Sequence, residues 1–117
     1  MSDRLGCGKE SGVEIHKGLV LIVDDDRENR QMLAEALTRA GFEVDLAVGG
    51  EDALAKGRDR EYDAIFSDMK MVPLSGLDVL DAFRKSAPET PVVLLTAFGS
   101  TETAIQAMKR GAFDYLT

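Results

Sequence analysis

The sequence predicts an α/β fold, a flavodoxin-like doubly wound parallel sheet of five strands in the order 2-1-3-4-5. From residue 19 onward, short apolar segments alternate with amphipathic segments of helical period. This alternation is typical of a parallel sheet covered by helices. The first, third and fourth apolar segments are apolar throughout and belong inside the sheet, whereas the second alternates with charged residues and belongs at an edge.

The first half of the chain supplies two strands and two helices. We expect them, in chain order, over residues 19–23, 27–40, 42–47 and 51–60. Asp25 or Asp26 can cap the start of the first helix, and Gly41 ends it. The apolar face of this helix consists of Met32, Leu33, Ala36, Leu37 and Ala40. The second helix contains Gly57, which weakens it.

The second half continues the alternation. We expect a strand, a helix, a strand and a helix over residues 64–67, 77–86, 92–96 and 101–110, and a fifth strand near Phe113. The helical period predicts that the third helix buries Leu77, Leu80 and Phe83. The same period predicts that the fourth helix buries Ala104, Ile105 and Met108.

Length and composition indicate one domain, over residues 19–117, behind a flexible leader, residues 1–18. The leader contains the only cysteine, Cys7, and the only histidine, His16, which are too few ligands for a metal site. A single cysteine, no long apolar run and no signal peptide predict a cytoplasmic protein that does not enter a membrane.

The net charge of the chain is -7. This charge argues against direct nucleic-acid contact, which requires basic surface to meet phosphates. It is compatible with a cation site or with a basic partner surface.

Polar residues follow three of the buried strands. Asp24 and Asp25 come after the first strand, Asp68 after the third and Thr96 after the fourth. In the predicted strand order these ends meet at one edge, where such sheets bind ligands. Clustered carboxylates suit Mg²⁺, an aspartate can act as a nucleophile toward phosphate, and a threonine hydroxyl can contact a phosphoryl oxygen. The alternative is that these residues only cap helices and turns, and for Asp26 alone we favour that interpretation.

Four segments, in this order and spacing, resemble the receiver domain of bacterial response regulators: "LIVDDD", "YDAIFSDMKMVPLSGLDVL", "PVVLLTAFGS" and "AIQAMKRGAFDYL". The resemblance covers residues 19–117. The stretch "TAFGSTETAIQAMKRGAFDYL" is most similar to receivers of the NtrC class, which belong to sigma-54-dependent regulators.

The resemblance implies a role for individual residues. Asp68 matches the phosphoacceptor. Asp24 and Asp25 match the acidic pair that holds Mg²⁺, with Asp25 as a direct ligand and Asp24 acting largely through water. Lys70 would contribute its backbone carbonyl to the metal.

The resemblance also implies a switch. Thr96 matches the hydroxyl that follows the phosphoryl group, and Ala97 matches the small residue that leaves it access. Tyr115 matches an aromatic residue that changes rotamer, although an ordinary half-buried aromatic would look the same in sequence.

The function implied is a phosphorylation switch and not an enzyme, apart from its own phosphoryl transfer and dephosphorylation. A sensor histidine kinase would be the phosphodonor, and the switch would control an output domain (AAA+ or DNA-binding) in transcription regulation. The fourth helix and fifth strand are the expected surface of a homodimer.

The sequence departs from the family pattern twice. Val72 and Pro73 stand where the family usually has proline and then often glycine, which alters the loop beside Asp68. The family also places Lys-Pro and a fifth helix directly after the segment matching "FDYLT". We therefore expect a truncated domain that lacks its last helix and has no catalytic lysine.

Two rival functions remain open from sequence. Asp24 and Asp26 have the D-x-D spacing of haloacid-dehalogenase-type phosphatases, but Glu28 stands where that family expects threonine or valine. The other rival is a receiver-like interaction module that takes no phosphate in this truncated form.

Overall fold

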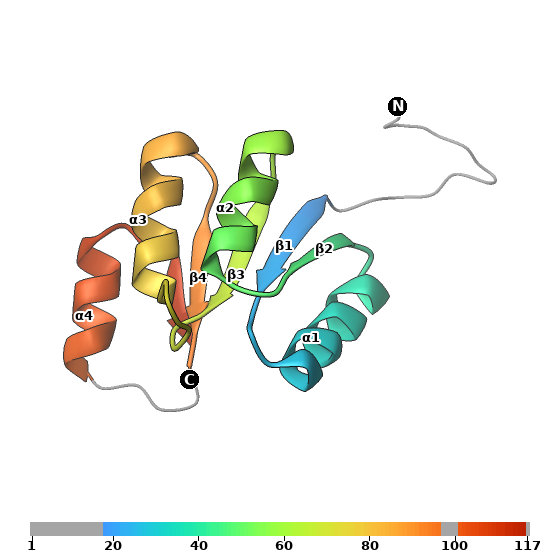
Figure 1. Ribbon diagram of the computed structural model, residues 1–117, viewed down its shortest axis with the longest axis horizontal. Coiled ribbons are helices and arrows are strands. Elements are labelled where there is room, and N and C mark those ends of the chain that lie inside the picture. The colour runs from blue at the N-terminus through green and yellow to red at the C-terminus, as the bar shows by residue number, and fades with distance from the viewer. Residues whose placement is uncertain (1–17, 97–100, 117) are drawn as a thin grey trace.

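A computed structural model describes residues 18–96 and 101–116, where strands and helices alternate (Figure 1). The elements are β1 (Leu19–Val23), α1 (Arg27–Arg39), β2 (Glu43–Ala47), α2 (Gly50–Asp59), β3 (Ala64–Asp68), α3 (Gly76–Ser86), β4 (Val92–Leu95), α4 (Thr101–Lys109) and β5 (Asp114–Leu116). Every expected element is present, and each bound agrees with the expected one to within one residue. The leader, including Cys7 and His16, lies outside the described residues.

The sheet is fully parallel, with the order β2-β1-β3-β4-β5. The predicted flavodoxin-like order is therefore confirmed. Because parallel crossovers are right-handed, a connection from β1 to β2 and one from β2 back past β1 to β3 place their helices on opposite faces. In this fold α1 lies on one face, and α2, α3 and α4 lie on the other (Figure 1).

The main core lies between the sheet and the three-helix face. Leu21, Ile65 and Leu94 from the central strands meet Val79 and Leu80 of α3, and all five are 0% exposed. Each such side chain contributes about 1.5–3 kcal/mol by leaving water. This core fixes the central strands and therefore the residues that follow them.

The helices next to the site have defined starts. The Asp26 carboxylate caps α1 by accepting a hydrogen bond from the Asn29 N–H at 3.0 Å. Ser75 and Asp78 form a reciprocal capping box at the start of α3. The chain leaves α1 through Gly41, whose φ of 103° suits glycine.

The prediction for α4 was wrong in which face is buried. Ile105 and Met108 are each 48% exposed, whereas Ala107 is 0% exposed. The helix contacts β5, the last strand of the sheet, and Ala107 belongs to the buried core cluster. Since α4 lies at the end of the sheet, its larger apolar side chains are left uncovered among the described residues. Leu77 of α3 is also half-buried instead of buried.

The face that carries α1 is less well covered. Val20 and Ile22 are each 1% exposed, but no residue of α1 itself is fully buried. Farther from α1 on the same face, Phe66 and Leu95 are half-buried, and Leu116 is 45% exposed. Apolar surface therefore remains open at the β5 side of the sheet. Among the described helices, none has both the length and the apolar character needed to cross a bilayer.

We expect the 117-residue chain to self-associate through α4 and β5, because an uncovered edge strand beside exposed apolar side chains favours pairing. Sedimentation velocity at rising concentration should show a dimer. Leu116→Lys should weaken the association by about tenfold, which corresponds to about 1.4 kcal/mol.

Val48→Lys is the matched control, since Val48 is 58% exposed and follows β2 at the opposite edge. It should leave the association unchanged. A chain that stays monomeric at every concentration, or an equal effect of both substitutions, would contradict this prediction.

Candidate functional site

Three carboxylates meet at the carboxyl ends of β1 and β3. Asp24 and Asp25 directly follow β1, and Asp68 ends β3. The two strands are neighbours, with Val23 opposite Ser67. One carboxylate oxygen from each aspartate lies within 4.8 Å of the others. The strand order thus produces the convergence that the sequence predicted.

The turn after β1 is held by three hydrogen bonds around Asp24. Its N–H donates to the Ala47 carbonyl of β2 at 3.2 Å, which extends the sheet by one residue. The Asp26 N–H donates to Asp24 Oδ1 at 2.9 Å, and Arg30 Nη1 of α1 donates to the Asp24 carbonyl at 2.8 Å. Arg30 was not among the predicted site residues, and its only signal in the sequence is a basic side chain one helical turn after the cap.

The backbone at Asp68 is held from several sides. The Met69 N–H donates to the Leu95 carbonyl at 2.8 Å, and the Ser67 hydroxyl donates to the Asp68 carbonyl at 3.1 Å. The Lys70 N–H reaches Asp68 Oδ1 at 3.4 Å. Asp68 therefore presents its carboxylate from a strand end that is hydrogen-bonded to β4.

Two carboxylates of the site, those of Asp24 and Asp68, have raised pKa values. Burial raises the pKa of Asp24, and the charges of Asp68 and Asp25 add to this, although the Asp26 N–H opposes it. Burial likewise raises the pKa of Asp68, with a further rise from Asp25, while the Lys70 N–H opposes it. A bound cation would reduce the repulsion among the carboxylates and would compensate the ionised Asp24 and Asp68 for the water that burial removes.

This group of donors fits Mg²⁺. The group consists of carboxylates alone, and Mg²⁺ is a hard cation that commonly takes one or two carboxylates and keeps several waters. Asp25 is exposed and Asp24 and Asp68 are half-buried, so the site is open to water.

The proposed switch residues lie on the next two strands. Thr96 follows β4, is 6% exposed, and its N–H donates to the Leu116 carbonyl of β5 at 3.0 Å. Tyr115 of β5 is half-buried, and its hydroxyl is buried with no hydrogen-bond partner among the described residues. Ala97 lies outside the described residues.

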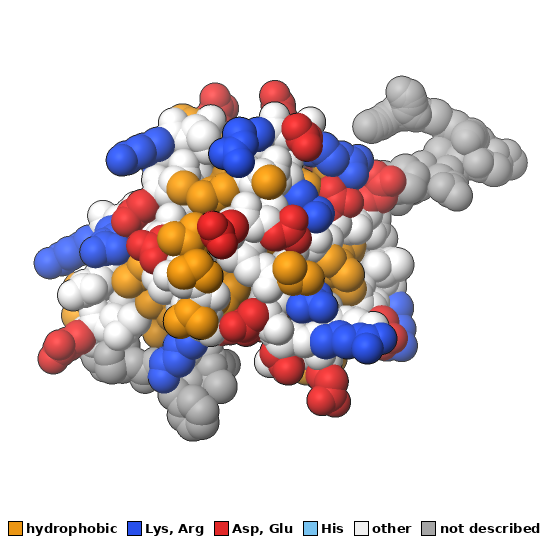
Figure 2. Space-filling view, viewed as in Figure 1, with side chains coloured by type: hydrophobic (Ala, Val, Ile, Leu, Met, Phe, Trp, Pro, Cys, Tyr) orange, Lys and Arg blue, Asp and Glu red, His pale blue; other side chains and the backbone are white. Residues whose placement is uncertain are grey.

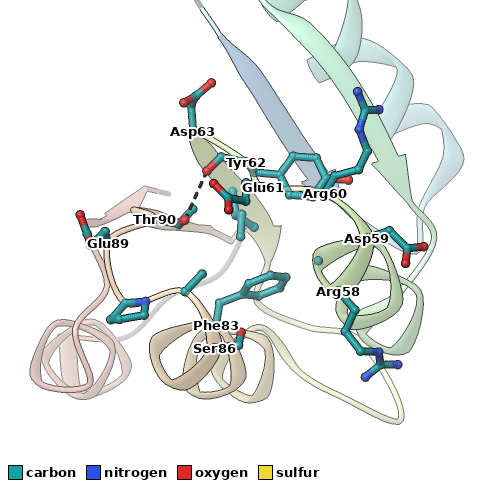
Figure 3. Close-up of a pocket in the computed structure, with 14 residues that line it drawn as sticks. Arg58, Asp59, Arg60, Glu61, Tyr62, Asp63, Phe83, Ser86, Glu89 and Thr90 are labelled. Atoms are coloured by element: carbon teal, nitrogen blue, oxygen red, sulfur yellow. Dashed lines mark hydrogen bonds between the residues drawn. The ribbon is translucent and has the colours of Figure 1, made fainter.

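A separate cleft lies at the opposite end of the sheet. It has a volume of about 720 Å³ and is lined by the last turns of α2 and α3 and by the start of β3 (Figure 3). The Thr90 hydroxyl donates to the Tyr62 carbonyl at 3.2 Å, and the Tyr62 hydroxyl donates to Asp45 at 2.8 Å. Both signs of charge line this cleft, and none of the three aspartates of the site does.

The surface over α2, α3 and α4 carries both signs of charge. In Figure 2 the basic and acidic side chains of the described residues are interspersed on this face, without a continuous basic area. The absence of nucleic-acid contact stays a prediction from the net charge of the chain.

A doubly wound parallel sheet with three carboxylates at its switch point defines a flavodoxin-like domain with an acidic, cation-compatible site. The chain belongs to the response regulator receiver domain family, whose model matches residues 20–117. The predicted family is therefore confirmed.

Relatives confirm the predicted subclass as well. ZraR of Salmonella typhimurium, a transcriptional regulatory protein, is 39% identical over 97 residues, which are 83% of this chain and 22% of that protein. The structure of NtrX from Brucella abortus is 37% identical with a TM-score of 0.78, over 84% of this chain and 23% of that one. Both are similar regulators of the NtrC-like class, and the chain spans about a fifth of their length.

A third similar structure was solved with ligands. TrrA of Thermotoga maritima, a response regulator in complex with Mg²⁺–BeF, is 33% identical with a TM-score of 0.77. The match covers 85% of this chain and 84% of that one.

The raised pKa of Asp68 predicts a pH dependence of stability without metal. Since its folded-state pKa lies above the unfolded value near 3.8, its contribution to stability is present below that value and is lost as pH rises through the folded pKa. Asp68→Asn keeps an acceptor for the Lys70 N–H. In chelator it should gain stability over wild type as pH rises toward neutral, measured by denaturant unfolding.

Asp52→Asn provides a control of opposite sign. A hydrogen bond from the Val48 N–H lowers the pKa of Asp52, so its contribution is present above the unfolded value and is lost as pH falls through the folded pKa. Asp52→Asn should lose stability at neutral pH relative to acid. Two variants with the same trend would contradict this account.

Proposed function

We propose that this domain is a phosphorylation-controlled switch in which Asp68 accepts a phosphoryl group from a histidine kinase. Asp24, Asp25, Asp68 and the Lys70 carbonyl would hold Mg²⁺. The observation that carries this proposal is the approach of three carboxylates within 4.8 Å at the ligand-binding edge of the sheet. The Mg²⁺–BeF complex of the similar protein TrrA supports it, since BeF stands in for a phosphoryl group on a carboxylate.

The chemistry needs little more than positioning and charge. The Asp68 carboxylate would act as the nucleophile and form an O–P bond while the P–N bond of the donor phosphohistidine breaks and its imidazole leaves. A cation held by Asp24, Asp25 and Asp68 would offset the charge of the incoming phosphoryl group. The acyl phosphate carries about two negative charges at neutral pH, where the carboxylate that it replaces carried one. Beyond this transfer and its hydrolysis, no catalytic turnover is part of the proposal.

The new charge would be sensed by Thr96 and Tyr115. Thr96 follows β4, next to the strand that ends in Asp68, and its hydroxyl is the group that would follow the phosphoryl oxygens. Among the described residues the buried Tyr115 hydroxyl has no hydrogen-bond partner, so no such bond to those residues would have to break if the ring changed rotamer. The pair therefore suits a switch that moves β5 and α4. Ala97, the third proposed member, lies outside the described residues, and its role stays a prediction from the family resemblance.

The readout would be a change of partner surface on α4 and β5. Ile105, Met108 and Leu116 leave apolar area exposed there, which suits a homodimer or an output domain. ZraR is a transcriptional regulatory protein, so control of transcription by an output domain of the parent protein is part of this proposal. Cytoplasmic location remains an expectation from sequence.

The phosphatase alternative is disfavoured by the position of Asp26. Its carboxylate accepts the Asn29 N–H as the cap of α1 instead of joining Asp24 in a D-x-D pair. If the protein hydrolysed a generic phosphate ester with turnover, the phosphatase function would be favoured again. Failure to take Mg²⁺ or BeF would favour the interaction module.

Mg²⁺ at millimolar concentration should raise the melting temperature, because it binds only the folded site. A ligand at 100 times its Kd stabilises by about 2.7 kcal/mol. Asp25→Ala should raise the metal-free melting temperature by removing a repelling charge, and it should abolish the Mg²⁺ effect.

Asp26→Asn is the matched control for this experiment. It removes the same charge from the same turn, yet asparagine still caps a helix and Asp26 lies outside the trio. It should retain the Mg²⁺ effect. Equal melting temperatures of wild type in Mg²⁺ and in chelator would refute the metal site.

Acetyl phosphate with Mg²⁺ should add one base-labile phosphoryl group, detected by intact mass spectrometry. Asp68→Asn should abolish the addition and Asp26→Asn should not. A phosphoryl group that persists in Asp68→Asn, or that maps to Ser67, would overturn the assignment of Asp68.

A further inference from the structure

The first residue of α3 packs directly on the backbone of the proposed phosphoacceptor. Gly76 is buried, and a Cβ built on it would lie 2.5 Å from the Asp68 carbonyl oxygen and 2.9 Å from the Met69 Cα. Both atoms belong to the backbone, so neither can move aside without moving the end of β3. Only a residue without a side chain permits this approach.

Hydrogen bonds hold the same contact from both sides. The Gly76 N–H donates to the Met69 carbonyl at 2.9 Å, which closes the loop between β3 and α3. The Ser67 hydroxyl, 0% exposed, donates to the Asp68 carbonyl at 3.1 Å. The Asp68 carbonyl thus accepts the Ser67 hydroxyl and also lies next to the position that a Cβ on Gly76 would occupy.

The helix on the other side of this contact is firmly anchored. The capping box of Ser75 and Asp78 fixes its first turn. Val79 and Leu80 are 0% exposed and Phe83 is 3% exposed, all within the core. An atom added at Gly76 would therefore displace the strand end as well as the helix.

We infer that Gly76 is a positioning residue for the site, and that it sets where Asp68 stands relative to Asp24 and Asp25 by letting α3 touch the β3 backbone. Ser67 supports it by holding the Asp68 carbonyl. This inference rests on the proposed function for its consequence, since a displaced Asp68 would lose metal affinity. Gly76 is helical and has no left-handed φ, so alanine there meets a steric and not a conformational obstacle.

The test compares Mg²⁺ affinity in Gly76→Ala and in Gly57→Ala by titration calorimetry. Gly57 is a matched control because a Cβ there would also enter filled space, against the ring of Phe83 in α3. It lines the cleft at the opposite end of the sheet. Gly76→Ala should raise the Kd for Mg²⁺ by about 10- to 100-fold, the usual effect of disturbing groups that orient metal ligands.

Gly57→Ala should leave the Kd nearly unchanged, although both substitutions should lower the metal-free melting temperature. Loss of stability alone therefore cannot produce the expected result. If Gly76→Ala binds Mg²⁺ as tightly as Gly57→Ala does, the inference is wrong.

Amide hydrogen exchange gives a second measurement that needs no metal. In Gly76→Ala the Met69 amide, bonded to Leu95, should exchange faster, while the Ile65 amide, bonded to Pro91 at the start of β3, should not. If wild type takes no Mg²⁺, the proposed function fails and this exchange alone decides the positioning role. Unchanged exchange at Met69 would overturn it.

Ser67→Ala decides the question if Gly76→Ala does not fold. It adds no atom and removes only the hydroxyl bonded to the Asp68 carbonyl. It should weaken Mg²⁺ binding or, in a chain without Mg²⁺ affinity, speed exchange at Met69. If neither changes, the Asp68 backbone is held without this contact and the inference is wrong.

Discussion

Repulsion among three carboxylates at one sheet edge is the constraint on which this structure depends. The strand order brings Asp24, Asp25 and Asp68 together, and no rearrangement of side chains can separate strands that are hydrogen-bonded in register. The cost shows in the raised pKa values of Asp24 and Asp68. The core between the sheet and α2 and α3 must offset this cost, and it does so with side chains that are completely buried.

Stability and chemistry are therefore divided between different parts of the domain. The residues that bury most apolar surface lie in the middle of the strands and on α3, away from the acidic edge. The residues proposed to respond to phosphate lie toward β5, where the sheet ends and the face that carries α1 is thinly covered. A change at Asp68 can thus be transmitted to a region that few contacts hold in place.

The sequence predicted the strand order and the convergence of the acidic residues because both follow from period and from what stands at strand ends. It could not predict which face of α4 would be buried. Ala104 lies close on the helix surface both to Ile105 and Met108 and to Ala107, and which of these sides is buried depends on where the helix meets β5. Nor could it identify Arg30 or Gly76. Arg30 donates a hydrogen bond to the Asp24 carbonyl, six residues away. Gly76 approaches the backbone of Asp68 and Met69, and a glycine in the sequence does not by itself show which backbone it contacts.

The two halves of the acidic site are far apart along the chain, since Asp68 lies 44 positions after Asp24. Closing so long a loop is slow, because its entropy is lost before β1 and β3 can pair. The complete cation site therefore forms only when the central sheet has assembled. An ion that binds it stabilises interactions formed late in folding, and such interactions mainly slow unfolding. A bound cation would thus lower the unfolding rate of the domain and would change its folding rate very little.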